Sequence, residues 1–177
     1  MCVPNPRDRF QQLAGKSPEE AKFYWTGGPI DVAERTYFAS LFSGSTAFES
    51  DEGLVIVDTG MSRLAGGLAA MLRQRTGSPV HTAIYTHGHV DHAFGLPAFL
   101  LPGQASPQVI GHRNMPARFA RYARTKKHNG ALNARQFGGA VAESTTAPYD
   151  TFGAPDLPPN VLYDDELDIQ VGGLSFW

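Results

Sequence analysis

The sequence predicts a layered α/β fold, because strand and helix patterns alternate along one stretch of the chain. Residues 54–57 form a continuous apolar run, which is typical of a buried strand. Residues 63–76 then place leucine and methionine at helical spacing, and the Gly-Ser-Pro sequence at 77–79 ends that pattern. Residues 80–86 form a second β-prone run. This order of strand, helix and strand predicts a sheet that is covered by helices.

Shorter patterns extend the architecture on both sides of this unit. Residues 36–40 and 45–49 are β-prone, and residues 108–111 form a brief strand pattern. Residues 114–127 are predicted to form a basic helix that has a proline in its first turn. The sheet is therefore expected to gain strands before and after the central unit.

The two ends of the chain have patterns of their own. Residues 1–29 are predicted to be a helical lead-in, and residues 145–159, rich in proline and threonine, to be a loop. Residues 167–171 alternate in polarity and lead through a two-residue glycine turn into residues 174–177, which predicts a hairpin. A length of 177 residues suits one domain of ordinary size.

Composition excludes several classes of protein. Hydrophobic residues make up 42% of the chain and charged residues 18%, which is typical of a soluble globular domain. No apolar run approaches the roughly 20 residues that a membrane span requires. The N-terminal residues lack the apolar core of a secretory signal, so we expect a cytoplasmic protein. The single cysteine, Cys2, excludes an internal disulfide and a cysteine-based zinc cluster.

Charge is distributed unevenly, although the net charge is only −2. Residues 92–142 contain seven Lys or Arg and no acidic residue, whereas residues 143–177 contain seven Asp or Glu and no basic residue. Arg118, Arg121 and Arg124 recur at every third position of the predicted basic helix. They can form a cationic wall for the sulfate, phosphate or carboxylate of a small-molecule substrate. The alternative is a solvated helix face that lies opposite the acidic segment.

Nucleic acid is a weaker partner for this basic helix. The net charge is slightly negative, and the sequence contains no RNA-binding motif. We therefore expect a small-molecule ligand, with neither a nucleic acid nor a membrane as partner.

The most informative pattern is the sequence His-Gly-His-Val-Asp-His at residues 87–92, which begins where a predicted strand ends. His87 and His89 are two apart in extended chain and can bind one metal ion, whereas Asp91 and His92 lie one turn further and can bind a second. Imidazole and carboxylate ligands suit zinc, and also iron or manganese. The alternative, a histidine-rich surface loop, is disfavoured by the spacing and by the preceding strand.

A metal site of this kind predicts a hydrolase. A bound divalent ion lowers the pKa of water from about 16 to about 7, so that metal-bound hydroxide can attack an ester-like centre at neutral pH. Asp91 is expected to orient the hydroxide or relay its proton. The hydroxyl side chains show no nucleophile–base spacing, which argues against a serine hydrolase. The other histidines, His81, His112 and His128, lack a motif and are interpreted as structural or solvent-facing.

Residues 55–60, with the sequence Val-Ile-Val-Asp-Thr-Gly, followed by a helix and by residues 84–92, resemble the metallo-β-lactamase superfamily of metallohydrolases. The resemblance covers residues 30–111 and implies an αββα sandwich. Segments between residues 112 and 138 are similar to alkyl-sulfatase-like members. The cationic helix favours an anionic substrate, with a sulfate ester as first choice and a lactone or thioester as the alternative.

The same resemblance assigns roles to individual residues. It implies that His87 and His89 hold a first metal ion, and that Asp91 and His92 hold a second. It further implies that Asp58, at the end of the preceding strand, is a carboxylate that orients the metal loop. Zinc is the expected metal, with two ions in the complete site.

The resemblance also predicts that part of the site is missing. Members of the superfamily draw a third histidine, a bridging carboxylate and a last histidine from the second half of the fold, and nothing here matches them. We therefore expect residues 1–177 to be a single domain that is incomplete at its C-terminus, the first half of the sandwich. The rival hypothesis is a non-catalytic half-domain. The sequence does not predict the oligomeric state.

Overall fold

The structure is a computed structural model that describes residues 28–137 and 152–177. The predicted lead-in at residues 1–29 falls almost entirely outside the described residues, as does the first part of the predicted loop at 145–159. Residues 152–159, the described part of that loop, form neither helix nor strand, as predicted.

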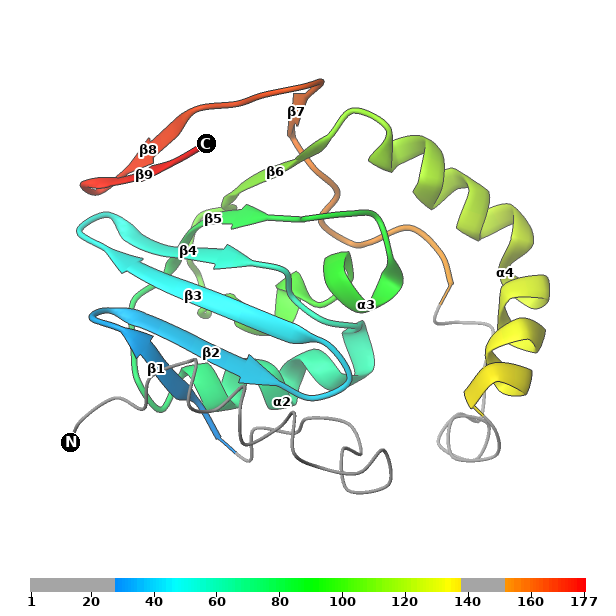
Figure 1. Ribbon diagram of the computed structural model, residues 1–177, viewed down its shortest axis with the longest axis horizontal. Coiled ribbons are helices and arrows are strands. Elements are labelled where there is room, and N and C mark those ends of the chain that lie inside the picture. The colour runs from blue at the N-terminus through cyan, green and yellow to red at the C-terminus, as the bar shows by residue number, and fades with distance from the viewer. Residues whose placement is uncertain (1–27, 138–151) are drawn as a thin grey trace, which may run out of the picture.

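Seven strands form one mixed sheet, and their order in space follows their order in the chain (Figure 1). Neighbouring strands pair antiparallel from the first to the fourth strand and parallel from the fourth to the seventh. The strands are β1 (Ile30–Ala33), β2 (Thr36–Ser40), β3 (Gly44–Ser50), β4 (Gly53–Val57), β5 (Val80–Ile84), β6 (Gln108–His112) and β7 (Val161–Tyr163). The strand patterns in the sequence correspond to β2 through β6. Strands β1 and β7 were not predicted, because each is short and lacks a continuous apolar run.

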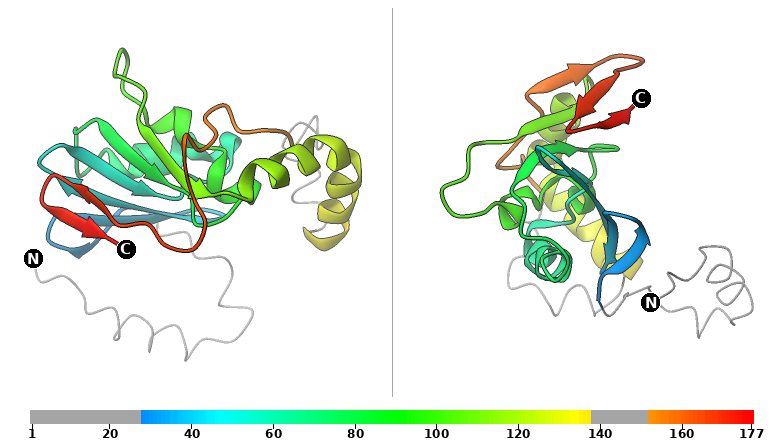
Figure 2. Two further views of the ribbon diagram at one scale, coloured as in Figure 1. Left: turned by 90° about the horizontal axis from the view of Figure 1, so that it is seen from above. Right: turned by 90° about the vertical axis from the view of Figure 1, so that its left-hand side faces the viewer.

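Helix α2 (Ser62–Leu72) connects β4 to β5 and packs on one face of the sheet (Figure 2). Its alanines and leucines at helical spacing enter the core, together with buried residues of the 3-10 helix η1 (Leu96–Phe99). The helix ends four residues before the predicted boundary at residue 76. Arg73 follows its last turn and donates hydrogen bonds to the carbonyl oxygens of Ser78 and Phe99, which ties the helix end to the turn before β5.

The predicted hairpin is confirmed and lies against the other face of the sheet (Figure 2). Strands β8 (Ile169–Val171) and β9 (Leu174–Phe176) are joined by glycines 172 and 173, whose φ values of 49° and 87° suit a tight hairpin turn. The ring of Phe176 meets Phe48 of β3 edge-on, with 5.3 Å between centroids. Since Ala47 is in the core under α2, the adjacent Phe48 side chain lies on the opposite face.

Helix α4 (Met115–Phe137) connects β6 to β7 and extends ten residues beyond the prediction. Its first turns bury Phe119 and Tyr122 in the core. A kink follows at Thr125, whose hydroxyl donates to the carbonyl oxygen of Arg121, a bond that often bends helices. Past the kink the helix lacks apolar spacing, so that it was not predicted. Asparagine side chains there donate hydrogen bonds to the preceding turn, 2.9 Å and 3.0 Å long.

The predicted α/β class is confirmed: helices cover one face of a large sheet and a hairpin covers part of the other. Among the helices of the described segments, none is long and apolar enough to cross a membrane.

Substituting Gly95 by alanine is expected to destabilise this packing strongly. A Cβ atom at Gly95 would lie 2.0 Å from the carbonyl oxygen of Thr59 and 2.5 Å from the Cβ of Ala65, and neither atom can move aside cheaply. We expect Gly95→Ala to lower the free energy of unfolding by about 3 kcal/mol or more, measured by urea denaturation. The matched control is Gly66→Ala. Gly66 lies in α2, next to Ala65, and nothing lies within 4 Å of its Cβ position. It should gain about 0.5–1 kcal/mol from helix propensity, and equal losses in both variants would contradict this packing.

Glu49→Gln is expected to remove a stabilising interaction only at pH values at which Glu49 is ionised. Its carboxylate accepts hydrogen bonds from Thr76, Ser78 and Tyr37, and these bonds, led by that of Thr76 and opposed by burial, lower its pKa from 4.5. A depressed pKa contributes stability above the unfolded-state value that is lost as pH falls through the folded-state value. We expect the variant to be less stable than wild type by roughly 1 kcal/mol at pH 7, with the difference shrinking at pH 3. A difference independent of pH would refute the role of the charge.

Candidate metal centre

The predicted metal loop lies at one edge of the sheet, where parallel strands end. The chain leaves β5 at Ile84, passes through residues 85–89 and enters the short helix α3 (Val90–Ala93). The neighbouring strand β4 ends just before Asp58, whose backbone N–H donates to the carbonyl oxygen of Ile84 at 2.9 Å. Because the carboxyl ends of parallel strands share one edge, residues far apart in sequence meet there.

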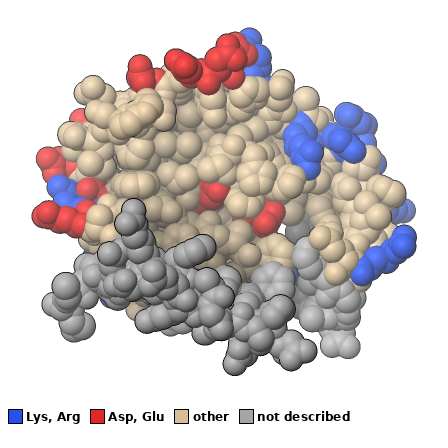
Figure 3. Space-filling view, in the orientation of Figure 1, with Lys and Arg blue, Asp and Glu red and all other residues tan. Residues whose placement is uncertain are grey.

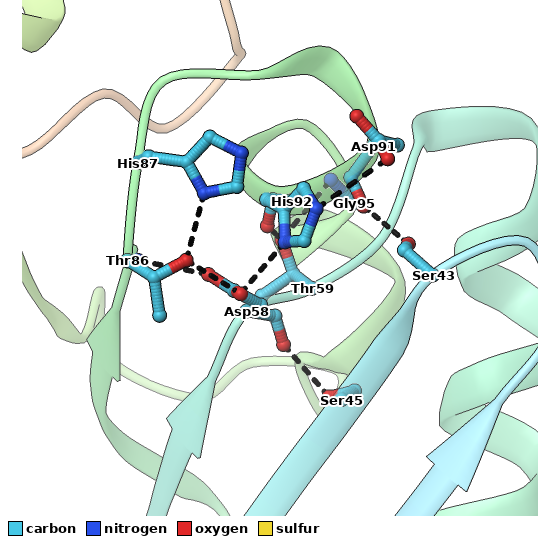
Figure 4. A network of polar contacts seen from close by, with 9 residues as sticks. All are labelled: Ser43, Ser45, Asp58, Thr59, Thr86, His87, Asp91, His92 and Gly95. Carbon is cyan, nitrogen blue, oxygen red and sulfur yellow. Dashed lines mark hydrogen bonds and ion pairs between the residues drawn. The ribbon is translucent and has the colours of Figure 1, made fainter.

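A turn after β4 holds the backbone of the metal loop in place (Figure 4). The backbone N–H of Thr59 donates to the carbonyl oxygen of His92 at 2.7 Å, and its hydroxyl donates to the same oxygen at 3.1 Å. The Thr59 hydroxyl also accepts from the backbone N–H of Gly95 at 3.2 Å. From β3 and its preceding turn, Ser43 donates to the Asp91 carbonyl and Ser45 to that of Asp58. The loop is thus positioned by its own scaffold.

The Asp58 carboxylate connects three groups around the loop (Figure 4). One oxygen accepts the backbone N–H of Thr86 at 2.8 Å. The other accepts the Thr86 hydroxyl at 2.7 Å and lies 2.7 Å from Nδ1 of His92. Asp58 is buried, and its φ of 56° places it in the left-handed region, which Asp tolerates better than most residues. This backbone conformation turns the chain at the end of β4, and the carboxylate of Asp58 lies beside the loop.

These contacts determine which edge of each imidazole remains available. An ionised carboxylate only accepts, so Nδ1 of His92 donates to Asp58. The Thr86 hydroxyl donates to Asp58, and its oxygen, 3.0 Å from Nδ1 of His87, can accept a hydrogen bond from the N–H of that ring. His87 and His92 are therefore both held by Nδ1, and Nε2 is the nitrogen left for a ligand. This is the arrangement in which a carboxylate orients metal-binding histidines.

The pKa values of the loop's histidines shift in opposite directions. Burial lowers the pKa of His87 and of His89, the positive charge of Arg118 lowers it further, and the Asp91 carboxylate opposes this without reversing it. Burial also opposes the charge of His92, but hydrogen bonds to Asp58 and Asp91 outweigh it and raise the pKa of His92 to about 9. At neutral pH two imidazoles are therefore neutral, while His92 carries a proton on Nε2 that must leave before this nitrogen can bind a metal.

The four predicted ligands converge in space. The ring of His87 lies 4.5 Å from that of His89 and 4.1 Å from that of His92, between centroids. Nε2 of His92 is 3.4 Å from a carboxylate oxygen of Asp91. This contact is an ion pair when His92 is protonated.

The loop does not, however, form a complete metal-binding site in the described residues. Within residues 28–137 and 152–177, no group of three or more His, Cys, Asp or Glu side chains is arranged to hold a metal ion. The physical reason is that the imidazoles pack against one another and Asp91 pairs with His92. Their chemistry nevertheless fits a divalent ion, because the set offers three imidazoles and one carboxylate. The assignment of all four as ligands stays a prediction.

The three arginines singled out in the sequence are placed differently by the structure. Arg118 is half-buried and packs against the metal loop, where its Cγ is 3.2 Å from the Cβ position of Gly88. Arg121 and Arg124 are exposed. Steps of three residues rotate by about 300° around a helix, so successive arginines diverge from one face. Substrate contact by Arg121 and Arg124 stays a prediction.

The remaining histidines lie apart from this cluster. His112 ends β6 at the same sheet edge, but its Nδ1 accepts the backbone N–H of Asn114 and its ring contacts Tyr163. His81 is exposed on β5, with Nδ1 2.8 Å from the hydroxyl of Thr82. His128 is exposed on α4.

A comparison with protein families identifies the fold. The family model described as the metallo-beta-lactamase superfamily matches residues 41–175. The chain belongs to the metallo-beta-lactamase superfamily. Members of this superfamily are generally metal-dependent hydrolases, and they often bind zinc. No curated protein sequence matches the chain.

Solved structures agree on the fold. A subclass B3 metallo-beta-lactamase of Bradyrhizobium japonicum is similar with a TM-score of 0.60 and 13% identity, over 85% of this chain and 51% of that one. A sec-alkylsulfatase from Pseudomonas sp. is similar with a TM-score of 0.58 and 20% identity, over 84% of this chain and 26% of that one. A beta-lactamase from Chitinophaga pinensis is similar with a TM-score of 0.55 and 18% identity, over 90% of this chain and 53% of that one. The chain therefore spans about half the length of the lactamases and a quarter of the sulfatase.

Sequence reasoning missed the hydroxyl groups that organise the site. Thr86 links His87 to Asp58, and Thr59 links the turn after β4 to the metal loop. The only sequence signal for these roles is that each threonine is adjacent to Asp58 or His87. This signal is weak, because hydroxyl residues follow many strands without such roles.

Asp58→Asn is expected to weaken metal binding without straining the backbone. Asn also tolerates the left-handed φ, but its amide cannot replace a carboxylate that accepts from Thr86 and His92 together. We expect zinc affinity, measured by competition with a chelator, to fall about 10- to 100-fold. The control Asp51→Asn removes an exposed carboxylate paired with Arg35 and should leave affinity unchanged. Equal affinity of Asp58→Asn and wild type would show that Asp58 does not orient the ligands.

Proposed function

We propose that this protein is a zinc-dependent hydrolase and that its metal ligands are His87, His89, Asp91 and His92. One observation carries the proposal: the Asp58 carboxylate, directly and through Thr86, holds the Nδ1 edges of two of these histidines. Histidines that bind a metal almost always donate their other ring N–H to a group of this kind, which fixes the orientation of the ring.

The ligand set also supports this metal. Imidazole nitrogens and a carboxylate oxygen suit zinc, and iron or manganese take the same donors. When bound, a divalent ion lowers the pKa of water to about 7, which makes hydroxide available at neutral pH.

The chain's own residues orient the reactants around such an ion. Burial opposes the charge of Asp91, but its contact with His92 lowers its pKa, so this carboxylate is ionised at neutral pH. It can accept a hydrogen bond from a water molecule and so fix the direction of the water's lone pair. Asp58, only 10% exposed at its side chain, keeps the imidazoles from rotating.

The substrate we propose is an ester with an anionic group, and a sulfate ester is the first choice. The half-buried Arg118 beside the loop supports a negative charge on the substrate, and one structural relative is a sec-alkylsulfatase. A lactone or a thioester is the alternative, because one fold can host several hydrolytic reactions.

A second hypothesis is a metal-binding domain without catalytic activity of its own. It is favoured by the chain spanning about half the length of its lactamase relatives and by the absence of a finished three-ligand cage among the described residues. It predicts metal binding without turnover of any substrate.

His87→Ala is expected to abolish both metal binding and hydrolysis. The experiment combines elemental analysis of the purified chain with rates on an aryl sulfate, an aryl acetate, a thioester and a lactone. We expect zinc to be lost and kcat/KM to fall at least about 100-fold, because His87 supplies a ligand nitrogen. His128→Ala, which removes an exposed histidine, should match wild type. Full zinc content and activity in His87→Ala would refute the ligand assignment, and zinc without turnover in wild type would favour the non-catalytic hypothesis.

A further inference from the structure

Arg118 lies directly on the peptide segment that joins two of the proposed ligands. A Cβ atom at Gly88 would meet the Cγ of Arg118 at 3.2 Å and its Cβ at 3.4 Å. Gly88 stands between His87 and His89, so the aliphatic stem of the arginine covers the loop at that point. A positive charge on α4 is thereby brought beside the candidate metal centre.

The guanidinium group is held in position by the next turn of α4. Its Nη2 donates to the hydroxyl of Tyr122 at 3.0 Å, and its Cζ lies 5.0 Å from the centre of that ring. Tyr122 is itself buried and its ring packs 5.5 Å from that of Phe152. The guanidinium is therefore oriented before any ligand arrives, which lowers the entropy lost on binding.

The hydrogen-bonding capacity of this guanidinium is largely unused. Its Nε is buried without a partner, the one buried side-chain nitrogen or oxygen in the described residues of which this is true. None of the ion pairs of the described residues involves Arg118. A buried donor without an acceptor and a cation without a counter-ion are both unfavourable, and an oxyanion would satisfy both.

Among residues 152–177, no acidic side chain pairs with Arg118. Acidic residues of this part gather along the top of the molecule in Figure 3, over the segment between β7 and β8, while basic residues lie at the right over α4. Within the described residues, the one ion pair between the two segments joins Arg113 to Asp164. Within the described parts of the chain, the charge of Arg118 therefore has no counter-ion.

We propose that Arg118 is a specificity-determining residue that binds an oxyanion of the substrate, a sulfate, phosphate or carboxylate group, beside the metal loop. The inference rests on the proposed hydrolase function and names the residue that binds the anionic group of its substrate. A guanidinium offers two parallel N–H donors to two oxygens of one anion, which an ammonium group cannot do. Neutral esters gain nothing from this contact, so Arg118 discriminates between substrates of similar shape.

The first test measures anion binding without catalysis. Sodium sulfate is titrated into the metal-free chain at constant ionic strength, and the shift in Tm is recorded. We expect wild type to be stabilised by sulfate, and Arg118→Met, which keeps an unbranched stem over Gly88, to lose at least 80% of that shift. Lys127→Met is the control, because it removes one exposed charge from the same helix and should keep the full shift. An equal shift in Arg118→Met and wild type, or no shift in wild type, would overturn the proposal.

The second test uses two aryl esters that differ only in a carboxylate on the acyl group. In the zinc-loaded protein we expect Arg118→Met to lower the ratio of kcat/KM for the anionic to the neutral ester about 10- to 100-fold, mainly through KM. Lys127→Met should leave this ratio unchanged, and an unchanged ratio in Arg118→Met would overturn the proposal. If circular dichroism shows that Arg118→Met is unfolded, Arg118→Lys replaces it and should lower the ratio about 3- to 10-fold. Should wild type hydrolyse neither ester, the proposed function fails, and the sulfate titration still decides the role of Arg118.

Discussion

The Asp58 carboxylate accepts hydrogen bonds from the backbone and side chain of Thr86 and from the ring of His92, and so joins the end of β4 to the loop that follows β5. An ionised carboxylate must have its acceptor sites filled when it is buried, so these contacts determine the orientation of the loop's side chains. Through Thr86 the same carboxylate orients His87. The geometry of the candidate metal centre thus depends on one charge at the end of a buried strand.

The rest of the fold supports that charge. Parallel pairing of β4 with β5 places Asp58 and Thr86 at the same edge, and the hydroxyl of Thr59 ties the far end of the loop to the turn after β4. Gly95 allows the loop backbone to approach Thr59 more closely than any side chain would permit. Helices α2 and α4 cover the same region and bury apolar residues beneath it. The hydrogen bonds of Asp58 and Thr59 and the close approach of Gly95 together position the loop.

The strand–helix–strand unit and the metal loop could be predicted from the sequence, because apolar runs and helical spacing are local patterns and four ligand residues in six are rarely accidental. Strands β1 and β7 could not, since each is stabilised by pairing with a neighbour rather than by its own pattern. The surroundings of the three arginines could not be predicted from the sequence either. Arg118 packs on the loop and Arg121 is exposed, a difference set by the rotation of α4, which sequence spacing alone does not define.

The central claim is that this loop binds a metal through imidazole nitrogens, and X-ray absorption at the zinc edge tests it most directly. The chain would be loaded with one equivalent of zinc, passed through a desalting column and measured in frozen solution. We expect zinc to be retained with at least two imidazole ligands at about 2.0–2.1 Å. Zinc that is lost on the column, or that is surrounded by oxygen ligands alone, would contradict it.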